Sequence, residues 1–569
     1  MYQCAKKSEG KLISFALAFV LLIHSLPVLA SPLSSDGGAT PYAPAFAGYN
    51  APAALSYEEI VTISGVEELD ADLGAKLNAL RHTPFISNEV HLSGAAPEFA
   101  ENDRLGKFIR VGLWNIERGV RLDEIKMALE QPEEFKRRIK ADPESPKYRE
   151  AIEQLENFRS VDVLVLNEAD LGLKRSAYAD VPRELASILK MNYAFGMEFI
   201  EVDPANIGTE ELNEQPTEAV DRDQYRGLHG SAILSRFPIK NARLIPLKHQ
   251  PYDWYNQEKK RVSIAETARR QLGKIAFQAD FTRQIRRGGR SVLIAELHIP
   301  QLAERQLTVV TTHLEDRCKP SDRRRQMQEV LSLIKDISGP VVLAGDFNTS
   351  GSSLKPTSIR HEIKNRLTSK KFWARQAVKS LVPIGFAVDF TIDAIKYART
   401  ANDPTAKGIP LIAPNKEEGL FKDIRRARFD DGYVFDFRGD ADRTINGTEG
   451  TLANSNQRAT SKGFISTHAM DRTYKAVGKN KLDWIFVKAY TRDPKDGDQP
   501  YRMAPHFART LESFNYSLGQ RLSDHNPITV DLPIEEPVIG SRPKNFNHRR
   551  QGGTQSIDYS SVTLCVLCG

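Results

Sequence analysis

Residues that could do chemistry stand at the end of a predicted core strand in residues 341–350, VVLAGDFNTS. The apolar run stops at Gly345, and an acid and an amide follow as Asp346 and Asn348. Because residues i and i+2 of a strand point to the same face, we expect these two side chains to form one oxygen-rich edge. The alternative interpretation is a simple turn, since Gly-Asp and Asn-Thr pairs are common turn formers.

The same pattern recurs along the chain, with polar residues where apolar runs begin or end. These residues are Asn115 and Glu117 in LWNIERG, Glu168 in VLNEAD, His313 in TTHLED, Asp483 in LDWIF, and Asp524 and His525 in SDHNP. Open α/β sheets usually hold their ligands at strand ends, so all of these side chains could converge on one end of the sheets. Taken singly, each also has a structural explanation, such as a helix cap, a bend or a core histidine.

The side chains in this set are carboxylates, amides and imidazoles, with no thiol among them. Oxygen ligands without cysteine suit a hard cation such as Mg²⁺ or Mn²⁺, and they make zinc a weaker candidate. Histidines beside carboxylates supply general acid or base groups and can hold a phosphate oxygen. The set therefore indicates metal-assisted hydrolysis.

A series of strands and helices must position these residues. Apolar strands are predicted at 108–114, 161–170, 192–202, 231–239, 291–299, 307–316, 341–348, 481–488 and 523–532. Apolar spacing predicts helices at 121–130, 148–159, 181–190 and 321–337. Strands that alternate with helices or with further strands, in two runs, indicate a layered α/β fold rather than a barrel or a bundle.

Three stretches interrupt this series. Residues 201–227 are acidic, residues 250–290 are basic, and residues 350–480 form a long insertion between the GDFN and LDW strands. Loops of this length are usually functional or disordered. The insertion contains an apolar stretch at 372–398 whose spacing fits helices that could cap the body. One hypothesis is that the insertion docks a partner or a membrane and so selects the substrate.

The N-terminus has the features of an export signal. Lysines at 6, 7 and 11 precede the apolar run LISFALAFVLLIHSLPVLA, which ends in small residues at Val28 and Ala30. We expect a signal peptide at 1–30, cleaved after Ala30, and a periplasmic or extracellular chain. The alternative is an uncleaved membrane anchor, because about nineteen apolar residues can span a bilayer.

Composition sets the remaining domain boundaries. Residues 31–56 are rich in Ala, Pro, Gly and Ser and are predicted to be a disordered linker, followed by a lead-in at 57–100. The folded body is expected at 101–533, and the Pro/Gly-rich and basic tail at 534–569 is predicted to be disordered.

The overall charge excludes little. A net charge of +6 and 40% hydrophobic residues are ordinary for a globular protein of 569 residues. A surface this weakly basic could serve nucleic acid, anionic lipid or nothing specific. The cysteines that remain after cleavage are Cys318, Cys565 and Cys568, too few for a disulfide scaffold.

The ordered motifs resemble those of the endonuclease/exonuclease/phosphatase superfamily, which has the fold of deoxyribonuclease I. WNIER, LNEAD, GSAILSRFPI, TTHLED, GDFN, LDWIFV and SDHNP occur in this order between about residues 108 and 532. Each motif alone is weakly specific, but seven in order form a strong signal. The resemblance implies a four-layer α/β/β/α sandwich with long insertions, and metal-dependent cleavage of a phosphoester.

The resemblance also implies a role for each residue of the set. On the metal side, Glu168 resembles the metal-binding glutamate, Asn115 and Glu117 complete that edge, and Asp524 resembles a second metal-side acid. On the catalytic side, Asp346 resembles the aspartate that orients or deprotonates the attacking water, and Asn348 resembles the amide that holds the phosphate. His525 resembles the histidine that contacts the phosphate, and Asp483 resembles the carboxylate that fixes His525. His313 matches a position that some members fill with tyrosine, and Glu117 could act on the metal through water.

Substrate identity stays open, because this fold serves nucleases, lipid phosphodiesterases and phosphatases of small molecules. We expect Mg²⁺ or Mn²⁺ as the cofactor, a phosphoester substrate such as nucleic acid, phospholipid or a small phosphorylated molecule, and no obligate protein partner. The alternative function is a non-catalytic binding protein that retains the fold.

Overall fold

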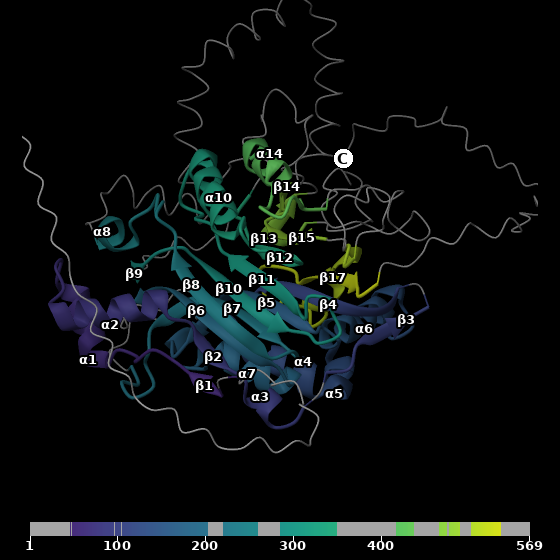
Figure 1. Ribbon diagram of the computed structural model, residues 1–569. Helices are drawn as coiled ribbons and strands as arrows, with labels where there is room; N and C mark the ends of the chain where they lie inside the picture. Colours follow the sequence, from purple (N-terminus) through teal and green to yellow (C-terminus); the bar gives the residue numbers. More distant parts are fainter. Residues whose placement is uncertain are drawn as a thin grey trace, which may run out of the picture. The chain divides into compact units, whose positions relative to one another are not determined.

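Two β-sheets pack face to face in the computed structural model, with helices outside them (Figure 1). The described residues are 46, 48–95, 97–103, 105–202, 220–259, 285–349, 417–436, 466–474, 477–489 and 502–535. All of them lie in the unit that runs from Phe46 to Gly569.

The larger sheet has ten strands in the order β1-β2-β6-β7-β5-β4-β17-β16, with β3 pairing with β4 and β9 with β6. These strands are β1 (Tyr49–Asn50), β2 (Phe85–Ser87), β3 (Ala100–Asn102), β4 (Gly106–Asn115), β5 (Val163–Leu171), β6 (Asn192–Glu201), β7 (Leu228–Ser235), β9 (Arg286–Gly288), β16 (His506–Thr510) and β17 (Ile528–Pro533).

The smaller sheet has five strands in the order β15-β12-β11-β10-β8. Its strands are β8 (Ile239–Pro246), β10 (Ser291–His298), β11 (Gln306–Thr312), β12 (Val341–Asp346) and β15 (Asp483–Lys488). A separate pair is formed by β13 (His468–Tyr474) and β14 (Val477–Asn480).

Side-chain alternation along the strands separates two cores. Along β5, Val163 and Val165 point into the core between the sheets, whereas Leu164 and Leu166 point into the core under the helices. β12 and β15 of the smaller sheet are buried on both faces, so β12 contains the continuous apolar run Val341–Ala344. β8, at the edge of the sheet, has exposed residues along its length.

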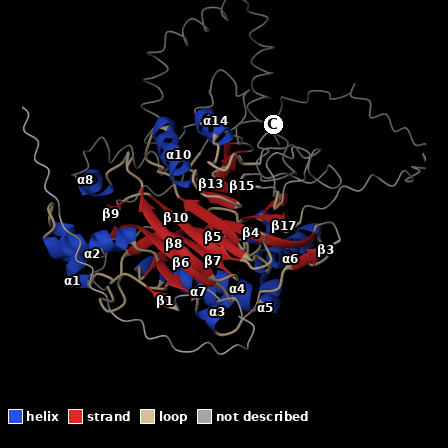
Figure 2. Ribbon diagram, in the orientation of Figure 1, coloured by secondary structure: helices blue, strands red, loops and turns tan. Residues whose placement is uncertain are grey.

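Helices form the outer layers on both sides of the sheets (Figure 2). The larger sheet is covered by α4 (Leu122–Glu130), α6 (Pro146–Arg159) and α7 (Val181–Leu189). The smaller sheet is covered by α10 (Pro320–Ile334) and α14 (Glu418–Arg426). The predicted α/β/β/α sandwich is therefore confirmed.

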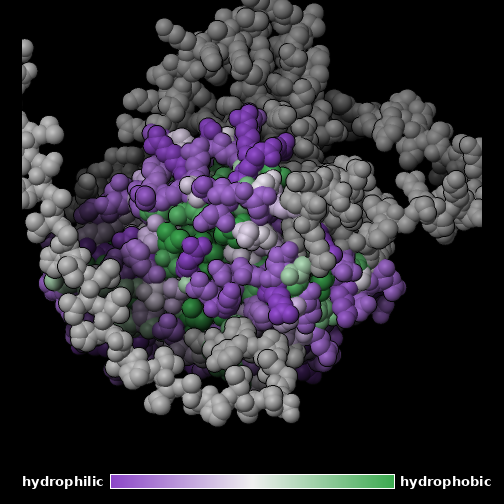
Figure 3. All heavy atoms as spheres, in the orientation of Figure 1, coloured by the Kyte–Doolittle hydropathy of each residue, from purple (hydrophilic) through white to green (hydrophobic). Residues whose placement is uncertain are grey.

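The remaining helices are short or peripheral. They are α1 (Tyr57–Gly65), α2 (Ala71–His82), α3 (Glu89–Leu92), α5 (Pro132–Arg138), α8 (Trp254–Lys259), α16 (Glu512–Asn515) and the 3-10 turns η1 (Glu117–Gly119) and η2 (Lys174–Ser176). No helix within the described ranges is both long and apolar enough to cross a bilayer. Hydrophilic residues predominate among the coloured atoms on the face that Figure 3 shows.

Several sequence-based boundaries are wrong. Part of the predicted linker is a strand, because β1 pairs with β2, and β2 pairs with β6 of the larger sheet. The lead-in 57–100 is thus part of the body rather than a segment before it. The strand predicted at 231–239 is two strands in different sheets, because the chain leaves β7 at Ser235 and enters β8 at Ile239.

Two of the three stretches that interrupt the predicted series also contain helices and strands that their composition did not predict. α8 and β9 lie in the basic stretch 250–290, and α14 lies in the insertion 350–480, where it packs against α10. The predicted signal peptide and the apolar stretch 372–398 lie outside the described residues, as does the tail from 536 onward.

Candidate active site

The strand order brings the polar strand ends together. β4 runs parallel to β5, and β11 runs parallel to β12, so the carboxyl ends within each pair are neighbours. β17 runs antiparallel to β4 with Ile528 opposite Leu113, which places the preceding loop at the end of β4. Antiparallel pairing of β12 with β15 sets Asp483 opposite Asp346. The residues singled out in the sequence therefore surround one point.

Asp346 lies at the centre of this arrangement and is 1% exposed. Its Oδ2 accepts a hydrogen bond from Asn115 Nδ2 at 3.1 Å and lies 3.7 Å from Nε2 of both His313 and His525. Its backbone N–H donates to Asn167 Oδ1 at 2.8 Å. The carboxylate is thus held between two imidazoles from different sheets.

Asn348 joins the site through a turn, not through strand alternation. β12 ends at Asp346, and Asp346 Oδ1 accepts a hydrogen bond from the Asn348 backbone N–H at 2.7 Å. Asn348 has φ 51°, in the left-handed region. Its side chain donates to the Leu314 carbonyl and lies 3.0 Å from His313 Nε2. Asp346 and Asn348 do lie at one edge, as predicted, but the turn after β12 brings them together rather than strand alternation.

His525 is fixed by Asp483, as the resemblance implied. His525 Nδ1 lies 2.7 Å from Asp483 Oδ2, so Nε2 faces Asp346. Burial alone would lower the pKa of His525, but the carboxylates of Asp483, Asp524 and Asp346 raise this pKa well above its usual value. The imidazole is therefore positively charged at neutral pH, next to an acid.

His313 has the opposite electrostatic setting. Arg290 Nη1 lies 2.9 Å from His313 Nδ1, and Arg290 is itself held by Glu198 at 2.9 Å and Glu315 at 3.3 Å. Burial lowers the pKa of His313 well below its usual value, and the Arg290 guanidinium lowers it further. The ring is therefore neutral, and the two histidines beside Asp346 differ in charge.

An acidic edge borders the two histidines and consists of Glu117, Glu168 and Asp524. Glu117 Oε2 accepts a hydrogen bond from the Asp524 backbone N–H at 2.8 Å. Glu168 Oε1 lies 3.9 Å from His313 Nε2, and Glu168 Oε2 lies 3.7 Å from Arg118 Nε. All of the predicted site residues are thus linked by direct contacts into one cluster.

Strained backbone aims several of these side chains. Glu117 and Glu168 have φ of 47° and 53°, which non-glycine residues rarely adopt. The pairing of β5 with β7 shifts register between Leu166 and Ala169, so Glu168 lies on a bulge. Bulges and left-handed residues cluster at functional sites, where they redirect a side chain out of the regular ladder.

The acids of the site have strongly shifted pKa values. Burial and the Asp524 carboxylate raise the pKa of Glu117 to about 8. Burial and the Asp483 carboxylate raise the pKa of Asp346 to about 7. Burial would raise the pKa of Glu168 as well, but Arg118 prevails and lowers it to about 2. The cluster holds more carboxylates than its own cations neutralise.

This donor set fits a hard divalent cation. Carboxylate and amide oxygens line the acidic edge without a thiol, which is the ligand chemistry of Mg²⁺ and Mn²⁺. Burial and the nearby Asp524 carboxylate both raise the pKa of Glu117, so the charged form of Glu117 is disfavoured there. A positive charge at this edge would offset the repulsion between the two carboxylates.

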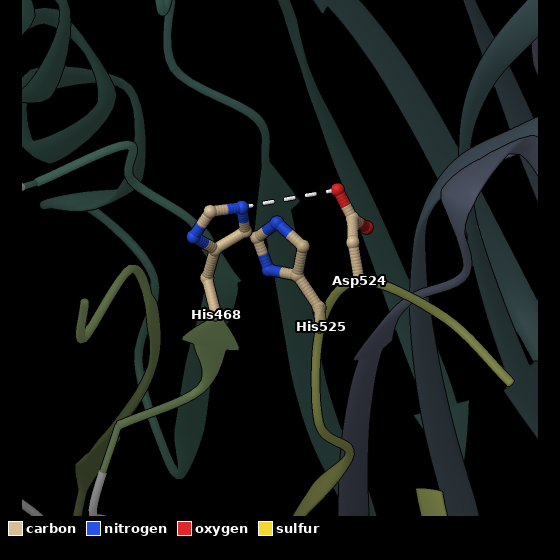
Figure 4. Close-up of side chains that lie close together, drawn as sticks. All are labelled: His468, Asp524 and His525. Carbon is tan, nitrogen blue, oxygen red and sulfur yellow. Dashed lines mark ion pairs between the residues drawn. The ribbon is translucent and has the colours of Figure 1, made fainter. Parts of the chain in front are cut away.

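Sequence reasoning missed three contributors to the site, Asn167, Ser523 and Arg290, and one neighbour of it, His468. Asn167 holds the Asp346 backbone, and Ser523 Oγ donates to the Asn115 carbonyl at 2.7 Å and accepts from the His525 backbone N–H. Both stand inside quoted motifs, so their neighbours could have indicated them. Arg290 and His468 come from the interruptions, where no strand pattern marks them. His468 lies beside Asp524 and His525 (Figure 4).

Comparison with known proteins adds a family match. The family described as "Endonuclease/Exonuclease/phosphatase family" matches residues 112–525, which is more than half of the chain. The match begins in β4 and ends at His525. No curated protein matches the sequence.

Solved structures of low identity are also similar to this chain. An endonuclease/exonuclease/phosphatase from Beutenbergia cavernae is 16% identical, covering 76% of this chain and 73% of its own, with a TM-score of 0.32. The catalytic domain of human Nocturnin is 16% identical over 76% of this chain and 95% of its own, with a TM-score of 0.31. A 3′-5′ exonuclease from Neisseria meningitidis is 13% identical over 74% and 99%, with a TM-score of 0.32.

Proposed function

The chain belongs to the endonuclease/exonuclease/phosphatase family and is a phosphoester hydrolase of that family, and we propose that it uses a divalent metal and acts outside the cytoplasm. The observation that carries the metal-dependent mechanism is the position of Asp346. Its carboxylate lies between a charged and a neutral imidazole, 3.7 Å from each, and borders an acidic edge. Such a site offers a base, two donors for phosphate oxygens and ligands for a cation.

Four residues would hold the cation, namely Glu168, Glu117, Asp524 and Asn115. Bound there, Mg²⁺ or Mn²⁺ supplies Lewis acidity and neutralises the charge that develops on a phosphoryl oxygen. Asn115 already donates to Asp346 at 3.1 Å, and this contact couples the acidic edge to the catalytic aspartate.

The other residues position water and phosphate. Asp346 is placed to orient or deprotonate the attacking water, and its pKa of about 7 suits a base at neutral pH. His525 is fixed by Asp483 and carries the positive charge that stabilises the phosphate as bonds form and break. Asn348 and His313, whose side-chain nitrogens lie 3.0 Å apart, are placed to hold phosphoryl oxygens.

The metal and the substrate class can be tested together. Plasmid DNA, RNA, sphingomyelin and inositol phosphates are incubated with the purified chain in Mg²⁺, in Mn²⁺ and in excess chelator. We expect hydrolysis of one class in Mg²⁺ or Mn²⁺, and loss of that hydrolysis in chelator with recovery when the cation is returned. Activity that persists unchanged in chelator would contradict the metal-dependent mechanism.

Export rests on the N-terminal sequence alone. The three lysines and the apolar run at 12–30 have the order of a signal peptide, and the small residues at its end suit cleavage. N-terminal sequencing of the protein from a secreting bacterial host should give a chain that starts at Ser31. A chain that keeps residues 1–30 and sediments with membranes would favour the anchor instead.

A further inference from the structure

His468, the first residue of β13, lies next to the hydrolytic site. His468 stands 57 positions before His525 and follows a segment that lies outside the described residues. Figure 4 shows its ring beside the ring of His525, with Asp524 on the far side of that ring. The two ring centres are 4.9 Å apart, and His468 Nε2 lies 3.9 Å from Asp524 Oδ2.

The backbone around His468 is anchored on both sides. His468 forms an isolated β-bridge with His525, and the Asn526 backbone N–H donates to the Thr467 carbonyl at 2.6 Å. Thr467 Oγ1 accepts hydrogen bonds from the backbone N–H groups of Leu482 and Asp483 at 3.0 and 3.1 Å. His468 is therefore tied both to the strand that carries Asp483 and to the loop that carries Asp524.

The three side chains present ligand atoms to a common point. One ligand atom each from His468, Asp524 and His525 can be chosen so that all lie within 4.8 Å of one another. Asp483 engages Nδ1 of His525, and Nε2 lies 3.7 Å from Asp346 Oδ2. The side chains of His468 and Asp524 are 21% and 28% exposed, so an ion from solvent can reach them.

The chemistry of this set differs from that of the acidic edge. Two imidazoles and one carboxylate suit borderline ions such as Zn²⁺, Co²⁺ and Ni²⁺, whereas an all-oxygen edge suits Mg²⁺. Asp524 belongs to both sets. An ion held by His468 and His525 would displace the proton from the His525 nitrogen that faces Asp346 and would draw Asp524 away from the acidic edge.

We propose that His468, Asp524 and His525 form a second metal site that takes a transition-metal ion such as Zn²⁺, and that its occupation inhibits hydrolysis. The inhibition rests on the proposed function, but the binding does not. His468 is the only member of the three that the proposed hydrolytic site does not use.

Binding is measured first, without any substrate. The full chain, with Mg²⁺ in excess to occupy the acidic edge, is titrated with ZnCl₂ by calorimetry and with Co²⁺ by visible absorption. We expect one site in the wild type, and His468→Ala should weaken its affinity by at least about 10-fold, because loss of even an outer partner costs about 10–100-fold. His82→Ala, which removes an exposed histidine at the end of α2, is the matched control and should bind as the wild type does.

Hydrolysis is measured second. Zn²⁺ should inhibit the wild type in excess Mg²⁺, whereas His468→Ala should keep its hydrolysis in Mg²⁺ and lose the inhibition. Circular dichroism confirms folding, and His468→Gln, of similar size, repeats both measurements in case the alanine variant does not fold.

Equal Zn²⁺ affinity in the wild type and the folded variants overturns the site. Loss of hydrolysis with unchanged affinity overturns it as well and makes His468 a substrate contact. If the wild type hydrolyses nothing, the proposed function fails while the Co²⁺ spectrum still decides the site.

Discussion

Asp346→Asn is expected to lower kcat/KM for phosphoester hydrolysis by about 10²–10⁴-fold, the range of a general base. Asparagine has the same shape and can still accept the hydrogen bond that Asn115 Nδ2 donates at 3.1 Å. It can neither take a proton from water nor carry the negative charge that faces His525. The loss should therefore fall on kcat rather than on KM, and steady-state rates over a substrate series measure the split.

The control for this experiment is an exposed aspartate between α10 and β12. Asp336 follows α10, is exposed and lies ten positions before Asp346. Asp336→Asn should stay within about twofold of the wild type, since exposed substitutions change free energies by about 0.5 kcal/mol or less. An Asp346→Asn variant that hydrolyses at the wild-type rate would support the alternative, a binding protein that retains the fold.

His525→Ala should also cost about 10²–10⁴-fold in kcat, because it removes the positive charge beside Asp346. Asp483→Asn should act in the same direction, since Asp483 Oδ2 holds His525 Nδ1 at 2.7 Å and selects the orientation of the ring. Kinetics of the two single variants and of the double variant form a double-mutant cycle.

The cycle has a clear expected outcome. Asp483 acts through His525, so the double variant should lose little more than His525→Ala alone. A double variant whose loss equals the product of the two single losses would mean that the pair does not work as a unit. Both side chains are buried, so thermal unfolding of each variant accompanies the kinetics to separate loss of fold from loss of chemistry.

The positions of the predicted residues follow from local rules. Apolar runs that stop at a polar residue predict strand ends, and the parallel neighbours β4–β5 and β11–β12 then bring those ends together. The layered α/β class was predictable from strands that alternate with helices, whereas the four-layer order was implied by the family resemblance, since β5 is a continuous apolar run in its first half. Asp346, Glu168 and His525 were predicted from polar residues at strand ends, and the order of the seven motifs made that prediction specific.

Other features depend on contacts that no local pattern encodes. Arg290 precedes β10 and His313 follows β11. The two residues are in contact because β10 and β11 are antiparallel neighbours in the smaller sheet. His468 reaches the site through a bridge across 57 residues. The turn at Asn348 and the bulge at Glu168 depend on unusual backbone angles, which the residue types do not announce. Short strands such as β1 and β2 are too brief to show a period.

The pairing of β1 and β2 with the larger sheet bears on how the protein can be shortened. β2 pairs with Tyr193–Phe195 of β6, and β9 pairs with Phe199–Glu201 on the same edge of β6. A truncation that began at residue 101 would remove β2 and leave that part of β6 with unpaired backbone groups. Such a bare edge invites pairing with another chain and aggregation. Recombinant versions that begin after the predicted signal peptide should therefore keep every residue from Phe46 onward.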